Sequence, residues 1–170
     1  FGGHSSSGRI AGHYGLKYGK TYAASNPFTI LIRGQGCHGA YPGSGIDSIA
    51  VACQVVAALQ TLVSRRIFAT DSAVVTVGSF HAGTAGNIIA GEAELKGIIR
   101  TLGPEMREKM SRMVKETAEG VAAAMGASAK IQIRTSYPGV VNEDGFTALV
   151  QQAMAELVGQ EGVELETIPN

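Results

Sequence analysis

The order of strand-like and helix-like patterns of apolar residues along residues 26–136 is the feature that most limits the possible folds. Segments that alternate apolar and polar residues, or are rich in β-branched residues, predict strands. Segments with an apolar residue at every third or fourth position predict helices. In chain order these are a strand at 28–32, a helix at 47–66, strands at 73–80 and 88–101, a helix at 104–125 and a strand at 130–135.

This order predicts an α+β fold, the ferredoxin-like βαββαβ sandwich, in which two helices cover one face of a four-stranded antiparallel sheet. The handedness of βαβ connections leaves few other topologies. Within 88–101, Glu92, Glu94 and Lys96 face one way, and Ala93 and Leu95 face the other. We therefore expect one solvated and one buried face of the sheet.

The spacing also predicts which face of each helix is buried. Ser44 or Asp47 is expected to cap the first helix. Methionines spaced as in the second helix fill a core far more often than they form a cofactor site. The expected core faces are Ile46, Ile49, Cys53, Val56, Leu59 (or Gln60) and Val63, widened by Ala50, Ala57 and Leu62, in the first helix, and Met106, Met110, Met113 (or Val114), Thr117, Val121 and Ala124 in the second.

The flanking segments follow a different pattern. Residues 1–25 are rich in glycine and predict a loop with one short strand near 9–14. After residue 136, Asn142 is expected to cap a helix at 144–157. Its apolar side has no partner within the six predicted elements. We therefore divide the chain into residues 1–25, 26–136 and 137–170, and we expect the last helix to belong to a larger structure.

The composition excludes several classes of protein. The 14 Lys and Arg residues balance the 14 Asp and Glu residues, which argues against the basic surface of a nucleic-acid-binding protein. No apolar run reaches the roughly 18 residues that a membrane span requires. No signal peptide is visible, and the two cysteines, Cys37 and Cys53, lack a metal-type spacing. A reduced, cytoplasmic location is therefore expected.

Three polar residues stand out as candidates for a functional site. His38 lies in the glycine-rich loop GQGCHGAYP, Asn87 lies in GTAGNII, and Arg100 lies in GIIRT. Each also has a structural interpretation, as an incidental loop residue, a turn residue and a solvated strand end, respectively. The 13 residues from Asn87 to Arg100 span about 40 Å in an extended strand. The two can share a ligand only through a twist, a bulge near Ala90–Gly91 or different subunits.

These motifs, in this order and at these separations, resemble the metal-dependent amidohydrolases of the aminoacylase and carboxypeptidase superfamily. The branch is that of hippurate hydrolase and the N-acyl-amino-acid hydrolases, and the resemblance covers about residues 8–160. It implies that residues 26–136 are a lid domain, which usually forms the homodimer. Residues 1–25 and 137–170 would then be partial flanking segments of an α/β catalytic domain.

The resemblance also implies roles for individual residues. His38 would enter the partner subunit's active site and stabilise an oxyanion. Asn87 and Arg100 would bind the substrate's carboxylate, a group that suits the planar guanidinium. His4, in FGGH, could match a metal-ligating histidine of the family. The run that follows His4 is shorter than in the family, so either the chain has a deletion there or His4 belongs to added sequence.

The implied function is hydrolysis of the amide bond of N-acyl-amino acids or small peptides. The full-length enzyme would use divalent metal ions such as zinc or manganese. This chain contains no Glu-Glu pair of the kind that the family uses for metal binding, so we expect it to bind no metal and to be inactive alone. The alternative is a stand-alone ferredoxin-like module for dimerisation or small-ligand binding, without catalysis.

Overall fold

The computed structural model describes residues 2–166. The chain divides into two compact units. We call Ala24–Pro138 the central unit, and Phe1–Ala23 together with Gly139–Asn170 the terminal unit. The assignment of these units to a lid and to flanks of a catalytic domain remains a proposal.

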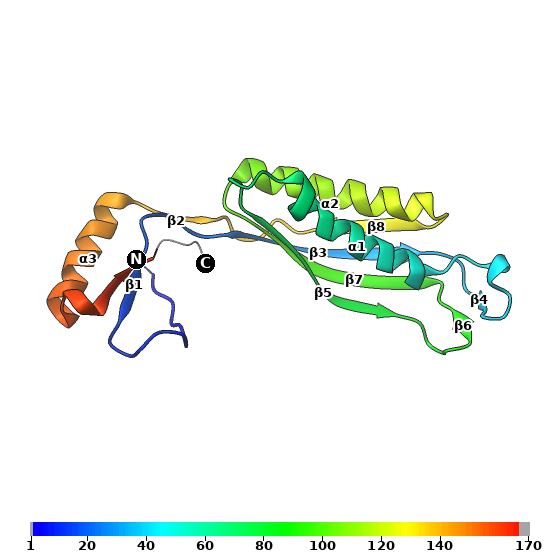
Figure 1. The fold of residues 1–170 in the computed structure, drawn as a ribbon, viewed down its shortest axis with the longest axis horizontal. Coiled ribbons are helices and arrows are strands. Elements are labelled where there is room, and N and C mark those ends of the chain that lie inside the picture. Colours follow the sequence, from blue (N-terminus) through cyan, green and yellow to red (C-terminus); the bar gives the residue numbers. More distant parts are fainter. Residues whose placement is uncertain (1, 167–170) are drawn as a thin grey trace. The chain divides into compact units, whose positions relative to one another are not determined.

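The central unit is an α+β sandwich in which both long helices lie on one face of a sheet (Figure 1). The sheet has four strands in the order β5-β7-β3-β8, all antiparallel. The predicted α+β class and the alternation of strands and helices are confirmed. In chain order, the elements are β3 (Ala24–Arg33), β4 (Cys37–His38), a 3-10 turn (Pro42–Ser44), α1 (Ser48–Arg66), β5 (Ala73–Ala82), β6 (Ile88–Ile89), β7 (Glu92–Thr101), α2 (Pro104–Ala124) and β8 (Ser128–Ile133).

The core lies between the helices and the sheet, as the alternation predicts. The buried strand residues include Phe28, Ile30 and Ile32 of β3 and Leu95 and Ile99 of β7. The intervening residues form the open face of the sheet, where two ion pairs occur. Arg33 Nε lies 3.1 Å from Glu92 Oε1, and Lys96 Nζ lies 2.7 Å from Glu94 Oε1.

The predicted core face of α1 was only partly right: Leu59 and Leu62 are buried and Val56 and Val63 pack against the core, but the first two turns are rotated away from the prediction. Ile49 is 38% exposed and Cys53 is also exposed. Residues 48–64 carry no charged side chain on any side of this helix, so the spacing permits more than one apolar stripe. The hydroxyl of Ser48 donates to the carbonyl of Ala90 at 2.8 Å, a contact that helps set the rotation of the helix. The buried face consists of Ser48, Val51, Ala52, Val55, Leu59 and Leu62.

The beginning of α1 is capped by Asp47, one of the two predicted caps. Its Oδ1 accepts from the backbone N–H groups of Ile49 and Ala50, at 2.9 and 3.3 Å. By length and composition this helix could also cross a membrane. Its buried residues, however, pack into the core of the central unit. The buried side of α1 is therefore part of that core.

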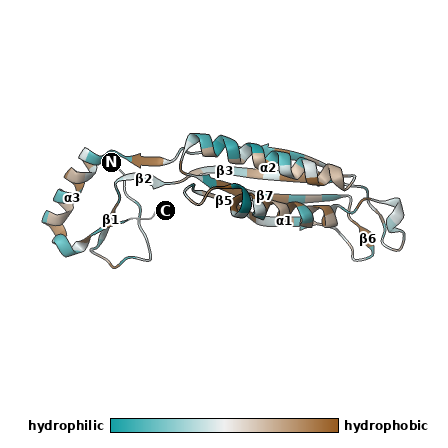
Figure 2. Ribbon diagram, turned by 45° about the horizontal axis from the view of Figure 1, so that its top comes forward, coloured by the Kyte–Doolittle hydropathy of each residue, from teal (hydrophilic) through white to brown (hydrophobic). Residues whose placement is uncertain are grey.

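The methionines of α2 fill the core, as predicted. Met110 and Met113 are buried together with Val114, Ala118 and Ala122, whereas the predicted Ala124 is exposed. The outer side of α2 is strongly charged, and Figure 2 shows it as mostly hydrophilic, in contrast to α1. The two helices therefore differ in the surface that they present to solvent.

Arg107 of α2 holds together the two ends of the central unit. Its Nε donates to Asn26 Oδ1 at 2.7 Å, and its Nη2 donates to the carbonyl oxygens of Ser136 and Ser25, at 3.0 and 3.5 Å. The N–H of Ser25 also donates to the carbonyl of Tyr137 at 3.1 Å. One side chain therefore fixes the segment that enters this unit and the segment that leaves it.

The terminal unit has short strands and one helix. Strand β1 pairs in parallel with β10, and β2 pairs antiparallel with β9. The predicted helix is confirmed, but the strand expected near 9–14 lies later in the chain. The elements are β1 (Tyr14–Leu16), β2 (Gly19–Tyr22), β9 (Val140–Asn142), α3 (Asp144–Val158), a 3-10 turn (Gln160–Gly162) and β10 (Val163–Leu165).

Glu143, not the predicted Asn142, caps α3. Its carboxylate accepts from the N–H groups of Gly145 and Phe146, at 2.9 and 2.6 Å. These hydrogen bonds, above all that from Phe146, lower the pKa of Glu143. Asn142 is engaged elsewhere, because its Nδ2 donates to the carbonyl of Lys17 at 2.8 Å.

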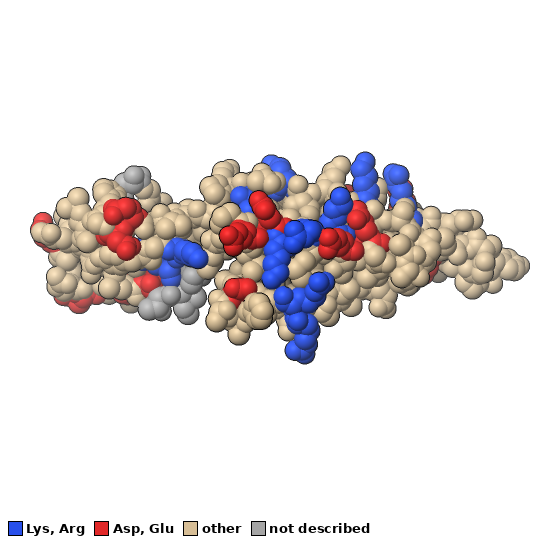
Figure 3. Space-filling view, turned by 90° about the horizontal axis from the view of Figure 1, so that it is seen from above, with Lys and Arg blue, Asp and Glu red and all other residues tan. Residues whose placement is uncertain are grey.

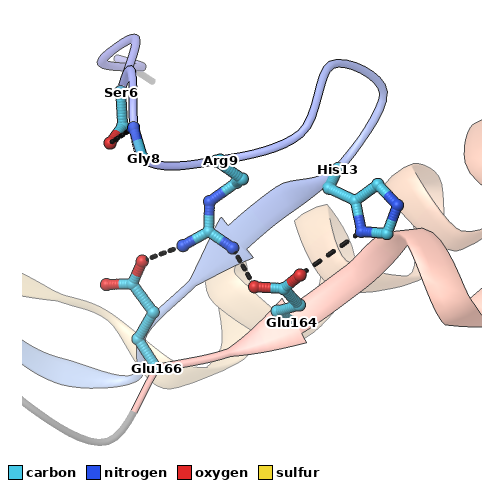
Figure 4. Close-up of polar contacts among 6 residues, drawn as sticks. All are labelled: Ser6, Gly8, Arg9, His13, Glu164 and Glu166. Atoms are coloured by element: carbon cyan, nitrogen blue, oxygen red, sulfur yellow. Dashed lines mark hydrogen bonds and ion pairs between the residues drawn. The ribbon is translucent and has the colours of Figure 1, made fainter.

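An ion-pair cluster attaches the N-terminal loop to β10 (Figure 4). The guanidinium of Arg9 bridges the carboxylates of Glu164 and Glu166. His13 Nδ1 lies 3.3 Å from Glu164 Oε1. All four side chains are at least partly exposed to solvent. The cluster therefore anchors a loop rather than forming a buried site.

Candidate functional site

A two-residue ladder joins the loops that carry His38 and Asn87. Strand β4 pairs antiparallel with β6, with Cys37 opposite Ile89 and His38 opposite Ile88. The N–H of Gly39 donates to the carbonyl of Asn87 at 2.8 Å. Residues that are 49 positions apart in the sequence are therefore neighbours at one end of the central unit (Figure 1).

This pairing was missed by the sequence reasoning, which placed His38 in a loop and treated 88–101 as one strand. The strand is interrupted at Ala90 and Gly91, and β6 leaves the main sheet to pair with β4. Two-residue strands have no detectable periodicity. Gly39 was the available signal, because a Cβ there would lie 2.9 Å from the carbonyl oxygen of Asn87. A glycine permits this close approach.

The imidazole of His38 is exposed and its orientation is defined by local contacts. Its Nδ1 accepts a hydrogen bond from the backbone N–H of Ala40 at 3.1 Å. The ring of Tyr41 lies 5.6 Å from it, centre to centre, at an angle of 51°. The ring therefore has a fixed partner at Nδ1 and an aromatic neighbour, while the residue itself remains open to solvent.

The surface around His38 and Asn87 lacks charge. We call residues 34–46 and 82–91 the tip; they contain no Lys, Arg, Asp or Glu. Figure 3 shows the end of the central unit that carries β4 and β6 as almost free of charged side chains. Tyr41 is 69% exposed and Ile88 is 48% exposed. An uncharged surface with exposed apolar side chains is typical of a contact region.

Arg100 lies at the other end of β7 and is not brought to the tip. It pairs with Ser25 of β3 and Val74 of β5. The ladder from Glu92 to Arg100 alone spans about 27 Å. Arg100 is exposed and makes no ion pair with any residue of 2–166, whereas Arg33 and Lys96 on the same face are paired.

The remaining candidate, His4, does not form part of a metal site within the described chain. Its ring lies 6.5 Å from that of Tyr22 in an edge-on arrangement. Among residues 2–166, no group of three or more His, Cys, Asp or Glu side chains could hold a metal ion. Residues 2–166 therefore offer no set of side chains that could form the metal centre of the implied full-length enzyme.

Comparison with known proteins places the fold and these motifs in one family. The profile of the peptidase dimerisation domain, M20_dimer, matches residues 12–126. The N-acetylcysteine deacetylase of Bacillus subtilis is 36% identical over 169 residues, which is 99% of this chain and 44% of that protein. The N-acetyldiaminopimelate deacetylase of Oenococcus oeni is 40% identical over 138 residues, which is 81% of this chain and 36% of that protein.

Solved structures agree with this result. A dinuclear metal-binding peptidase of the M20 family from Bacillus subtilis superposes with a TM-score of 0.71 at 30% identity. The match covers 98% of this chain and 41% of that one. The chain thus spans less than half the length of the relatives that it matches. With the profile covering more than half of the chain, this protein belongs to the peptidase dimerisation domain family of the M20 hydrolases.

Proposed function

We propose that the central unit is the lid and dimerisation part of a metal-dependent amidohydrolase that cleaves the amide bond of N-acyl-amino acids or small peptides. The family membership and the deacetylases among the relatives support this proposal. The activity belongs to a longer protein, since the chain spans only 36–44% of those two relatives. Residues outside this chain would hold the metal ions. A cytoplasmic location fits the same proposal.

The observation that carries the proposal is the division of the candidate residues between two ends of one sheet. His38 and Asn87 share the uncharged tip, while Arg100 lies at least about 27 Å away along β7. A small substrate cannot contact both ends of the same subunit. We therefore propose that each active site combines the tip of one subunit with Arg100 of the other.

The chemistry of these groups suits that arrangement. An imidazole N–H aimed at the carbonyl under attack stabilises the developing oxyanion, and such a donor contributes about 3–4 kcal/mol. Arg100 has an exposed guanidinium without an ion-pair partner among the described residues. A planar guanidinium binds a carboxylate through two parallel hydrogen bonds. The substrate would therefore be held by its carboxylate and activated at its carbonyl by different subunits.

The surfaces of α1 and β5 support a homodimer through this unit. Residues 48–64 of α1 contain no charged side chain, although Ala50, Cys53 and Ala57 are exposed. Strand β5 is an edge of the sheet and also has no Lys, Arg, Asp or Glu, whereas the other edge, β8, carries Lys130. Charged residues protect an edge strand from pairing. We therefore propose that α1 and β5 meet their copies in the dimer.

A shallow groove between α1 and β5 extends this surface; it is lined by Gln60, Val63, Ser64, Ala73, Val74 and Val75.

This dimer interface is tested by Ala57→Arg, which would place a charge on the exposed face of α1. We expect this variant to be monomeric when its mass in solution is measured by light scattering. The matched control, Gln132→Arg, puts the same charge on β8 and should leave the dimer intact. A dimer that survives Ala57→Arg, or one that Gln132→Arg dissociates, would contradict this interface.

The shared active site is tested by mixing two inactive variants of the full-length enzyme. His38→Ala removes the proposed oxyanion donor, and Arg100→Ala removes the carboxylate ligand. In a mixed dimer, one of the two sites combines the intact Arg100 of one subunit with the intact His38 of the other. Random exchange of subunits between equal amounts of the two variants should therefore restore about one quarter of the wild-type kcat. Half of the dimers are then mixed, and each mixed dimer has one intact site of two.

Two results would contradict the proposal. If both groups came from the same subunit, mixing would restore no activity. If neither substitution lowered turnover of an N-acyl-amino acid, the residue roles would be wrong. The alternative of a stand-alone binding module is not favoured, because the relatives that this chain matches are longer hydrolases.

A further inference from the structure

We infer that the backbone N–H of Ala40 holds His38 in the neutral tautomer that carries its proton on Nε2. The Ala40 N–H donates to Nδ1 at 3.1 Å. A ring nitrogen that accepts a hydrogen bond carries no proton, so the proton of a neutral ring must be on the other nitrogen. Ala40 thereby acts as a positioning residue through its main chain, independently of its methyl side chain.

The position of the Ala40 N–H is itself fixed by hydrogen bonds on both sides. The N–H of Gly39 donates to the carbonyl of Asn87 at 2.8 Å, and the N–H of Tyr41 donates to the carbonyl of His38 at 2.9 Å. These bonds close a tight turn over residues 38–41 and tie it to the loop of Asn87. The Tyr41 ring lies against the imidazole. The turn is therefore built to present one nitrogen of the ring, Nε2, to an external group.

The consequence for catalysis rests on the proposed function. With Nδ1 occupied by Ala40, His38 can act on a substrate only through Nε2–H, as a hydrogen-bond donor. This is the state needed to stabilise an oxyanion, since the donor is in place before charge develops. His38 is thus predicted to be a donor with a preset tautomer, and not a base that accepts the substrate's proton.

The tautomer can be measured in the 170-residue chain without any enzymatic activity. NMR with ¹⁵N labelling, at a pH where the rings are neutral, distinguishes an accepting ring nitrogen from one that carries a proton. We expect His38 to show an accepting Nδ1, a protonated Nε2 and a through-bond coupling between Nδ1 and the Ala40 nitrogen. His81, exposed at the end of β5, serves as the control and should show averaged tautomers. Averaged signals for His38, or a proton on Nδ1, would overturn the inference.

A pair of substitutions in the full-length enzyme tests the geometry independently. The amide nitrogen of glutamine lies near the position of Nε2, and that of asparagine lies near the position of Nδ1. We expect His38→Ala to lower kcat by about 10²–10³-fold, and His38→Gln to retain at least about tenfold more kcat than His38→Asn. An asparagine variant as active as the glutamine variant would overturn the inference. If all three variants had wild-type kcat, the proposed function would be wrong, and the NMR result would still decide the tautomer.

Discussion

The two units of this chain differ most in what they bury. Every buried hydrophobic residue among residues 2–166 belongs to the central unit, between Ala24 and Ala122. In the described part of the terminal unit, the buried side chains belong to polar residues, which are Lys17, Thr21 and Thr147. Helix α3 meanwhile exposes Leu149 and Leu157. The central unit therefore has a hydrophobic core of its own, whereas the described part of the terminal unit leaves large apolar side chains exposed.

This difference has a consequence for the stability of each unit. Apolar area removed from water contributes about 25 cal/mol per Å² to stability. The central unit gains this contribution across a whole helix–sheet interface. The terminal unit depends on short strand pairs, a helix cap and the ion pairs around Arg9. Exposed ion pairs contribute little, so its own stability is expected to be low.

The largest expected effect comes from truncating one leucine in each unit. Leu59 of α1 is fully buried, and Leu157 of α3 is 80% exposed. Leu59→Ala should lower the free energy of unfolding by about 2–5 kcal/mol, from lost burial and the cavity that remains. Leu157→Ala should change it by less than about 0.5 kcal/mol. Urea denaturation followed by circular dichroism measures both.

The same two leucine substitutions can also test the difference between the two units in the longer protein. If further protein covers α3 there, Leu157→Ala should become as costly as Leu59→Ala. A large loss for Leu157→Ala already in the 170-residue chain would show that the terminal unit has a core of its own.

The second prediction concerns packing density within the central unit. A Cβ on Gly97 would overlap with the ring of Phe28 and the backbone oxygen of Thr76. Gly97→Ala should therefore destabilise this unit by about 1–3 kcal/mol. The control is Gly120→Ala on the exposed side of α2, where no atom lies within 4 Å. It should stabilise the helix by about 0.5–1 kcal/mol. Thermal unfolding of both variants checks the sign as well as the size of each effect.

The third prediction uses the cap of the central unit's first helix. Asp47 accepts from two backbone N–H groups at the start of α1. Asp47→Ala should cost about 1 kcal/mol, and Asp47→Asn should retain most of the capping. Denaturation of the three proteins in parallel measures these differences. Equal stability of the alanine variant and the wild type would mean that packing of α1 alone determines where it begins.

The smallest expected effect is a pH dependence in the terminal unit. Hydrogen bonds from Phe146 and Gly145 lower the pKa of Glu143, so the folded state favours its carboxylate. This contribution is present above the ordinary pKa of a glutamate, and it is lost as the pH falls through the lowered value. The protection of the Gly145 and Phe146 amides against hydrogen exchange, expressed relative to the intrinsic exchange rate at each pH, should fall over that acidic range. Glu143→Gln should remove this dependence, and persistence of the dependence in that variant would assign it to another group.

Much of the central unit could be predicted because its strands have one solvent-exposed face and one buried face. The alternation of Glu92, Glu94 and Lys96 with Ala93 and Leu95 identifies a half-buried strand without any tertiary information. The methionine spacing of α2 was sufficient for the same reason, since its other side is charged. In α1 the prediction was right for Leu59 and Leu62 and wrong for Ile49 and Cys53, because a helix without charged residues from 48 to 64 offers little contrast from which to choose a face.

The sequence by itself determined the α+β class, the order of the long elements and the motifs by which the family is recognised. These depend on local periodicity and on the identity of short segments. Only the tertiary structure decided which face of α1 is buried and that β6 leaves the sheet to bring Asn87 beside His38. The physical reason is that these features depend on contacts between residues distant in the chain, and a two-residue strand pair leaves no periodic trace in the sequence.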